Sequence, residues 1–198
     1  MVNLLYFFLI NGLILTEPPF LNEWKEISFE CEGNYQINKE KSLSFLLSNY
    51  FGLPYSFEFS FDISYEEKDF DFLLYLKKGF SLSVIDMALR GGISLKEKNP
   101  FLIFSGGKEL AVITFYGCGG FSYKREEKKY SSLFGFAFEK EISNLLLASE
   151  FYKEGNDKII TLGLTYSLPI FDVYLGIRKN LANGLIFNLG ISKNFLFN

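Results

Sequence analysis

The segment from Tyr55 to Tyr65 reads YSFEFSFDISY and alternates between apolar and polar residues. Side chains alternate between the two sides of a β-strand, so this pattern predicts a strand with two distinct faces. One face would carry the apolar residues Phe57, Phe59, Phe61, Ile63 and Tyr65. The other would carry the polar residues Ser56, Glu58, Ser60, Asp62 and Ser64. One face is therefore heavily aromatic, and the other bears hydroxyl groups and charges.

The same alternation continues to the end of the chain and predicts about twelve strands. They read WKEISFECEGNY, KSLSFLLSNY, YSFEFSFDISY, DFDFLLYLK, GFSLSVIDMALRGGIS, PFLIFS, ELAVITFYGCGGFSY, SSLFGFAFEK, SNLLLASEFYK, KIITLGLTYSL, IFDVYLGIRK and GLIFNLGISKNF. Most have a length that suits a tilted strand crossing a bilayer. PFLIFS is short, and its loss together with a neighbour would leave about ten strands.

The connections between these strands fall into two alternating classes. One class is polar and charged: QINKEK, YEEKD, KEKN, KREEKK, KEGNDK and KNLANG. The other is short and contains Pro, Gly or aromatic residues: FGLPY, KKGF, SGGKE, EKEIS and SLPIF. Outer-membrane barrels place longer polar loops outside and tight turns on the periplasmic side, so an even strand number would put every charged connection outside.

Nearly every predicted strand has an apolar face, and no predicted helix is available to cover it. A closed antiparallel up-and-down β-barrel in lipid accepts this arrangement, with aromatic residues outward and polar residues inward. The sequence therefore predicts an all-β transmembrane barrel. The alternative is a soluble, exported lipocalin-like barrel that binds an apolar ligand, in which the phenylalanine faces would point inward.

Composition narrows the function classes. Aromatic residues make up 19% of the chain, hydrophobic residues 48% and charged residues 22%. This composition suits a barrel with an apolar, lipid-facing band between two solvent-exposed rims. The net charge of -3 gives no electrostatic case for nucleic-acid binding. The chain has no histidine, the commonest general base and transition-metal ligand, so we expect no enzyme activity, no metal site and no cofactor. Cys31 and Cys118 form no metal motif and are interpreted as free thiols.

Residues 1–20 are predicted to form a signal-like segment and residues 21–198 the barrel. The run LLYFFLINGLIL, from Leu4 to Leu15, has the length of a secretory h-region and is short for a spanning helix. A first strand and an uncleaved anchor are the alternatives. If this segment directs export, the predicted location of the barrel is the outer membrane, and the lipid bilayer is its first expected partner.

The last predicted strand alternates towards Phe195, close to the end of the chain. Such a final strand resembles the C-terminal signal by which bacterial outer-membrane barrels are recognised. That resemblance implies the barrel-assembly machinery as a second partner.

The order of segments from Gly79 onward resembles a family of outer-membrane barrels linked to the MetA pathway of phenol degradation. The matching segments are GFSLSVIDMALRGGIS, FYGCGGFSYKRE, FGFAFEKEISNLLLASEFYKEG, LGLTYSLPIFDVYLGIRKNLANG and FNLGISKNF. The resemblance covers a little over half of the chain and implies a pore or transporter with no catalytic residue. The chain is shorter than expected for that family between Leu95 and Glu109.

If the aromatic faces point outward, charged residues line the interior. The candidate lumen residues, with a role in selectivity, are Glu30, Glu58, Asp62, Asp86, Arg90, Glu150, Asp172 and Arg178. Glu26, Asp71, Lys77 and Tyr174 are expected on the same inner face. A narrow channel for small solutes, with a preference for cations, is the leading hypothesis because charged rings screen solutes. A non-conducting structural barrel with an ion-paired interior remains the alternative.

Overall fold

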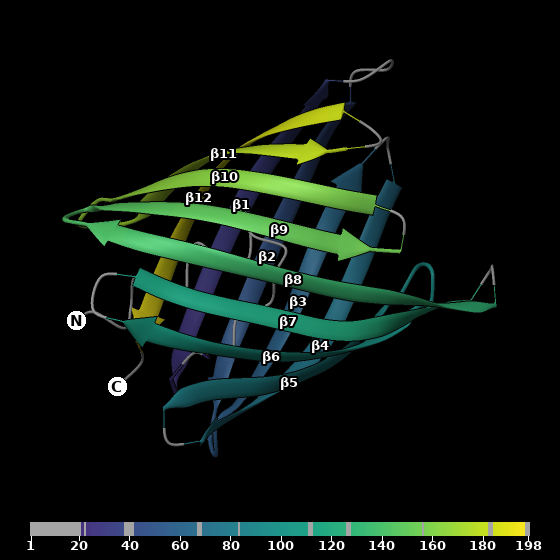
Figure 1. Cartoon of the computed structure of the whole chain (residues 1–198), viewed down its shortest axis with the longest axis horizontal. Helices are drawn as coiled ribbons and strands as arrows, with labels where there is room; N and C mark the ends of the chain where they lie inside the picture. Colours follow the sequence, from purple (N-terminus) through teal and green to yellow (C-terminus); the bar gives the residue numbers. More distant parts are fainter. Residues whose placement is uncertain are drawn as a thin grey trace.

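The computed structural model describes residues 21, 23–37, 42–66, 69–82, 84–110, 113–125, 128–155, 157–181 and 184–196. These residues form twelve β-strands (Figure 1). The strands are β1 (Glu26–Ile37), β2 (Ser42–Leu53), β3 (Phe57–Glu66), β4 (Asp69–Leu82), β5 (Ile85–Ser94), β6 (Pro100–Leu110), β7 (Ile113–Lys124), β8 (Lys129–Ile142), β9 (Leu145–Glu154), β10 (Asp157–Ser167), β11 (Asp172–Asn180) and β12 (Gly184–Leu196). No helix among the described residues is long and apolar enough to cross a membrane.

The strands form one closed barrel, in which each strand pairs with its neighbours in sequence. β1 and β12 close the barrel as an antiparallel pair, with a register that runs from Glu26 opposite Leu196 to Ile37 opposite Leu185. Closure pairs the backbone groups of both edge strands, which an open sheet would leave exposed. The predicted fold class, an all-β closed antiparallel barrel of about twelve strands, is confirmed, and the ten-strand alternative is not needed.

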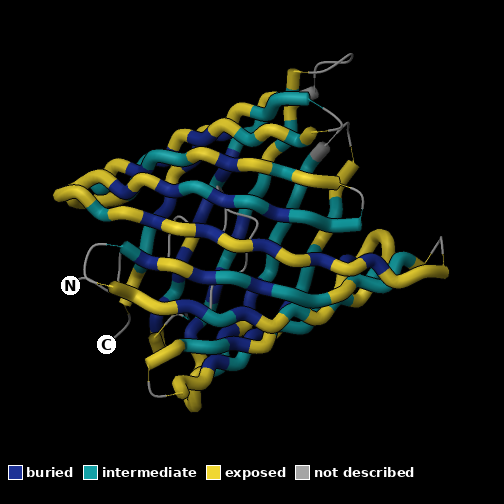
Figure 2. Tube along the Cα trace, in the orientation of Figure 1, coloured by how far each residue is buried: buried dark blue, intermediate teal, exposed yellow. Residues whose placement is uncertain are grey.

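The aromatic face of β3 points outward. Phe59 is 38% exposed, whereas Glu58 is 1% and Ser60 is 0% exposed. Figure 2 shows the same alternation of buried and exposed positions along most strands. In β8, Phe134, Phe136 and Phe138 are exposed, and the residues between them are buried. The interior of the barrel therefore holds the polar faces, and the arrangement expected for a soluble lipocalin-like barrel is absent from these strands.

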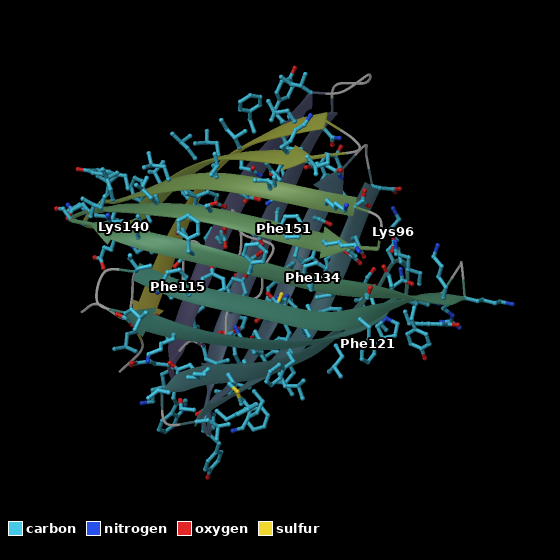
Figure 3. All side chains as sticks on the ribbon, in the orientation of Figure 1. Lys96, Phe115, Phe121, Phe134, Lys140 and Phe151 are labelled. Carbon is cyan, nitrogen blue, oxygen red and sulfur yellow. The ribbon has the colours of Figure 1, made fainter. Side chains whose placement is uncertain are left out.

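Phenylalanine side chains cover the outside of the wall, and Figure 3 labels Phe115, Phe121, Phe134 and Phe151 on the near side. Several outward-facing tyrosines lie towards the rim that carries the charged connections. There Tyr123 pairs with Tyr130 across β7 and β8, with ring centroids 5.0 Å apart. Barrels in lipid have such a pattern, with an apolar band bounded by aromatic residues at the interface.

Three expected connections are wrong in position. KKGF lies inside β4, SGGKE lies inside β6, and most of EKEIS lies inside β8. These strands continue further, to Leu82 in β4, Leu110 in β6 and Ile142 in β8. PFLIFS is accordingly the first half of a full-length strand, β6. Glycine and charged residues predicted turns at these places. In the barrel, however, these residues continue to form backbone hydrogen bonds with the neighbouring strands, so the strands do not end there.

The alternation of connection classes agrees with the strand order. The charged connections follow the odd-numbered strands from β1 to β11, so they all lie at one rim, opposite the rim where β1 begins and β12 ends. The signal-like segment, residues 1–20, lies outside the described residues.

Candidate functional site: the inner wall of the barrel

The eight candidate lumen residues share strand faces with the buried residues and therefore face the interior. Glu30 lies on β1, Glu58 and Asp62 on β3, Asp86 and Arg90 on β5, Glu150 on β9, and Asp172 and Arg178 on β11. The strand alternation sets these positions, because each residue lies an even number of places from a buried neighbour. Their role in selectivity remains a prediction.

Carboxylates and tyrosines gather on the wall formed by β1 to β4. The Tyr75 hydroxyl donates a hydrogen bond to Asp62 Oδ1 at 3.3 Å. The rings of Tyr50 and Tyr75 lie 6.2 Å apart, and both residues are buried. Glu30 is close enough to Asp62 for their carboxyl groups to interact electrostatically. This part of the wall therefore combines carboxylate groups with tyrosine rings.

Two cations lie beside this acidic wall. Glu58 is opposite Lys77 across β3 and β4, and Lys77 is opposite Arg90 across β4 and β5. The Arg90 guanidinium lies over the Tyr75 ring, with its carbon 3.4 Å from the ring centroid. Since a guanidinium is attracted to the face of an aromatic ring, this contact orients Arg90 along the wall.

A second mixed group lies where β11, β12 and β1 meet. Glu32 is buried, and Asn188 Nδ2 donates a hydrogen bond to its Oε1 at 3.0 Å. Arg178 is close enough to attract the Glu32 carboxylate. The Tyr174 hydroxyl is a neighbour of both Glu30 and Glu32, so it connects this group to the acidic wall.

The remaining candidates are Glu150, Asp86 and Asp172. Glu150 and Arg178 flank Thr161, which pairs with both across β9, β10 and β11. Asp86 lies nearer the rim where β1 begins and β12 ends. The Ser81 hydroxyl donates a hydrogen bond to Asp86 Oδ1 at 2.5 Å. Asp172 lies near the same rim, between Ser167 and Ser192 in the strand register.

Two buried carboxylates are absent from the sequence-based set: Glu32 and Glu139. Glu32 follows Glu30 by two positions within the predicted strand WKEISFECEGNY, so the alternation already places it on the inner face. Glu139 lies where the predicted strand SSLFGFAFEK overlaps the predicted turn EKEIS, and in the structure it lies inside β8 and is 0% exposed. The Tyr116 hydroxyl donates a hydrogen bond to Glu139 Oε1 at 2.9 Å.

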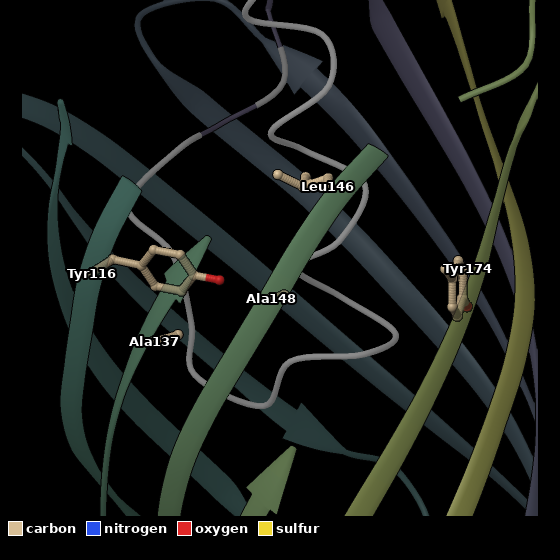
Figure 4. Packing of buried hydrophobic residues seen from close by; sticks show 5 residues of the cluster. All are labelled: Tyr116, Ala137, Leu146, Ala148 and Tyr174. Carbon is tan, nitrogen blue, oxygen red and sulfur yellow. The ribbon is translucent and has the colours of Figure 1, made fainter. Parts of the chain in front are cut away.

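The expectation that aromatic residues point outward is wrong for several tyrosines. Tyr50, Tyr75, Tyr116 and Tyr152 are buried. Tyr174, which the sequence predicts on the inner face, is buried as well. Figure 4 shows Tyr116 and Tyr174 in one interior cluster with Ala137, Leu146 and Ala148. A phenol has an apolar ring and a polar tip, so it can pack beside alanine and also donate a hydrogen bond to a carboxylate. The period of two identifies these positions, because each shares a face with polar residues.

The inner wall is thus polar, rich in acids and closely packed. Among the described residues, no group of three His, Cys, Asp or Glu side chains could hold a metal ion. Cys31 and Cys118 form no disulfide, and the former lies on the outer face and the latter on the inner face. Fixed charges of this kind attract or repel ions that approach the interior, and the tyrosine rings add surfaces on which a solute can stack.

Comparison with known proteins identifies solved structures of similar fold but no matching sequence family. No protein-family model matches the sequence. No curated protein matches it either. Among solved structures, the chain is similar to the KdgM porin, with a TM-score of 0.69 and 11% identity over 84% of this chain and 99% of that chain. The KdgM porin is also known in complex with disordered oligogalacturonate.

Two other solved structures share the architecture. The NanC porin has a TM-score of 0.70 and 11% identity over 83% of this chain and 98% of that chain. The COG4313 outer membrane channel from Pseudomonas putida F1 has a TM-score of 0.63 and 9% identity over 89% of this chain and 97% of that chain. The chain therefore has the fold of porin-like outer-membrane barrels.

Proposed function

We propose that this chain is an outer-membrane β-barrel that forms a narrow channel for small solutes. The observation that carries the proposal is the division between the two faces of the closed wall. The outer face presents exposed phenylalanine, leucine and isoleucine side chains, whereas the inner face holds the carboxylates. Only a closed barrel can cross a bilayer with β-strands, because closure satisfies every strand edge.

The proposed channel favours cations. The inner wall carries the acids Glu26, Glu30, Glu32, Glu58, Asp62, Asp71, Asp86, Glu139, Glu150 and Asp172, against the bases Lys77, Arg90 and Arg178. Rings of Asp and Glu select cations in pores. Oligogalacturonate, which is bound by the KdgM porin, is a polyanion, and an acid-rich wall would disfavour a solute of that charge.

Reversal potentials in planar bilayers test this proposal. With a tenfold salt gradient across the bilayer, we expect single-channel currents whose reversal potential has the sign of cation selectivity. Replacing Glu30 and Asp62 by Gln and Asn should move the reversal potential towards zero, because two fixed negative charges are removed. Replacing Lys193, an outward-facing residue of β12, by Gln serves as the control and should leave the potential unchanged. Anion selectivity of the unmodified protein would contradict the proposed preference.

A non-conducting barrel is the second candidate, and one observation favours it. Glu58, Lys77 and Glu139 are each no more than 2% exposed, so the side chains of the interior pack closely against one another. Steady electrical silence across a range of voltages, from protein shown to be inserted in the bilayer, would favour this candidate over a channel.

Further parts of the proposal depend on sequence patterns. The order of segments from Gly79 supports a relationship to the MetA-linked barrel family, which would give the chain a transport role and no catalytic activity. The alternating strand β12, which ends at Leu196, supports recognition by the barrel-assembly machinery. The apolar run within residues 1–20 supports export.

A further inference from the structure

The outer wall of the barrel contains an apolar groove of about 990 Å³ across β10, β11, β12, β1 and β2. Leucines and isoleucines of β10 to β12 line one side of it, including Leu164, Leu175 and Ile177. On the other side lie Tyr35, Leu43 and Phe45. Gly33 faces outward within the groove and adds no side chain of its own to it. The groove therefore lies in the band that the proposed function places in lipid.

Three lysines lie on the same outer face, towards the rim that carries the charged connections. Lys153 of β9 and Lys158 of β10 are directly opposite each other in the strand register. Lys179 of β11 is two residues beyond Ile177, the last groove residue of that strand, and the ladder places it opposite Leu185. Ile160 is opposite Lys179, so Lys158 and Lys179 are diagonal neighbours.

This grouping is unfavourable without an anion. Like charges directly opposite each other destabilise a strand pair. The outward-facing described residues of β9 to β12 include no carboxylate that could offset the three lysines. Lys153 Nζ lies 5.8 Å from the centroid of the Phe134 ring, which holds its side chain against the outside of the wall. The three ammonium groups thus face the boundary between the apolar band and the rim.

We propose that this face binds a membrane lipid whose headgroup carries a net negative phosphate, with an acyl chain in the groove and the phosphate beside Lys153, Lys158 and Lys179. The inference depends on the proposed membrane function. The lysines supply charge at headgroup depth, and the leucine-lined groove supplies apolar contact directly below them. A soluble phosphate would use the lysines alone, and a neutral lipid would use the groove alone, so an anionic lipid is the ligand that uses both.

Native mass spectrometry of the detergent-solubilised barrel tests the site. The probes are phosphatidylglycerol, phosphatidylcholine with identical acyl chains, and inorganic phosphate. We expect phosphatidylglycerol to bind more tightly than phosphatidylcholine by roughly tenfold or more, since each basic residue near a membrane surface attracts an anionic lipid. The triple variant K153Q/K158Q/K179Q should lose that preference.

Two further variants distinguish the contribution of the lysines, which bind the headgroup, from that of the groove, which binds the acyl chain. Lys96 lies at the same rim but forms an ion pair with Asp69 at 2.7 Å, so K96Q is the matched control and should keep the preference. Gly33→Leu should weaken the binding of both lipids equally, because the leucine side chain fills part of the groove. A Cβ at Gly33 would meet its neighbours at ordinary distances of 3.7 and 3.8 Å, so the backbone there accepts a side chain.

Equal binding of the two lipids, an unchanged preference in the triple variant, or full competition by inorganic phosphate would overturn the inference. Failure of the proposed membrane function has a different readout. In that case the protein would be monodisperse in plain buffer without detergent. A detergent-dependent barrel that lacks the lipid preference would contradict the lipid site alone.

Discussion

At the scale of single residues, Gly120 is a position in the wall of the barrel where only glycine fits, and its neighbour Gly119 is a position where any small residue would fit. A Cβ added at Gly120 would collide with the Leu102 carbonyl oxygen and lie 2.9 Å from Ile103 Cα, both backbone atoms of β6. A Cβ added at Gly119, on the opposite face of the same strand, would meet nothing within 4 Å. The close approach of β6 and β7 therefore depends on Gly120.

This contrast gives a paired prediction. Gly120→Ala should lower the free energy of unfolding by about 1–3 kcal/mol, because backbone atoms must shift to accept the methyl group. Gly119→Ala should leave stability unchanged or raise it slightly, since glycine is disfavoured inside strands. Urea unfolding in lipid vesicles, followed by tryptophan fluorescence, measures both. Equal effects of the two substitutions would contradict the close approach of β6 and β7.

The buried carboxyl group of Glu139 leads to a second prediction at this scale. Tyr116→Phe removes the hydroxyl that donates to Glu139 Oε1 and leaves a buried polar atom without that partner. We expect a loss of about 1–3 kcal/mol in the free energy of unfolding. Tyr166→Phe makes the same chemical change on the outer face and should have little effect. The same unfolding assay applies, and a Tyr116 variant as stable as the parent would show that the hydrogen bond does not matter.

At the scale of elements, the strands could be read from the sequence, whereas several of their ends could not. Alternation extends over ten or more residues in β3 and β8, so many positions support each strand and its inward face. A turn is marked by only a few residues, and Gly106 and Gly107 indicated one although both are paired in β6. Glu139 was missed for the same reason. Which residues pair across a closed ladder depends on all strands together, and no local pattern gives that register.

The closing register can be tested by cross-linking. Cys31 of β1 is opposite Ile191 of β12, and both face outward. Directly opposite residues in an antiparallel pair have Cα atoms about 4.5–5.5 Å apart, a range that permits a disulfide. In a Cys118→Ser background, Ile191→Cys should form an intramolecular disulfide with Cys31 on oxidation, detected by mass spectrometry after proteolysis.

Leu189→Cys is the matched control, because Leu189 is opposite Gly33 and lies one pair away from Cys31 on the same face. It should form the disulfide much less readily than Ile191→Cys. Preferential cross-linking of the Leu189 variant would indicate a register shifted by two residues.

At the scale of the whole molecule, the account depends on which face of the wall meets lipid. The sequence was sufficient to predict an all-β barrel, because nearly every strand is amphipathic and no helix is predicted to cover the apolar faces. The rule of outward aromatic residues is wrong for the buried tyrosines of β2, β4, β7 and β9, because it treats tyrosine like phenylalanine although the period of two places these tyrosines on the polar face. The proximity of Tyr174 of β11 to Glu30 and Glu32 of β1 arises only when distant strands close into one wall.

Spin labels placed singly along β3, from position 57 to position 64, test this orientation most directly. With the protein in lipid vesicles, labels at Phe57, Phe59, Phe61 and Ile63 should show high accessibility to oxygen, which dissolves in hydrocarbon. Labels at Glu58, Ser60, Asp62 and Ser64 should show low accessibility to oxygen, with a period of two along the strand. High oxygen accessibility at the carboxylate and serine positions, or no alternation, would contradict the account.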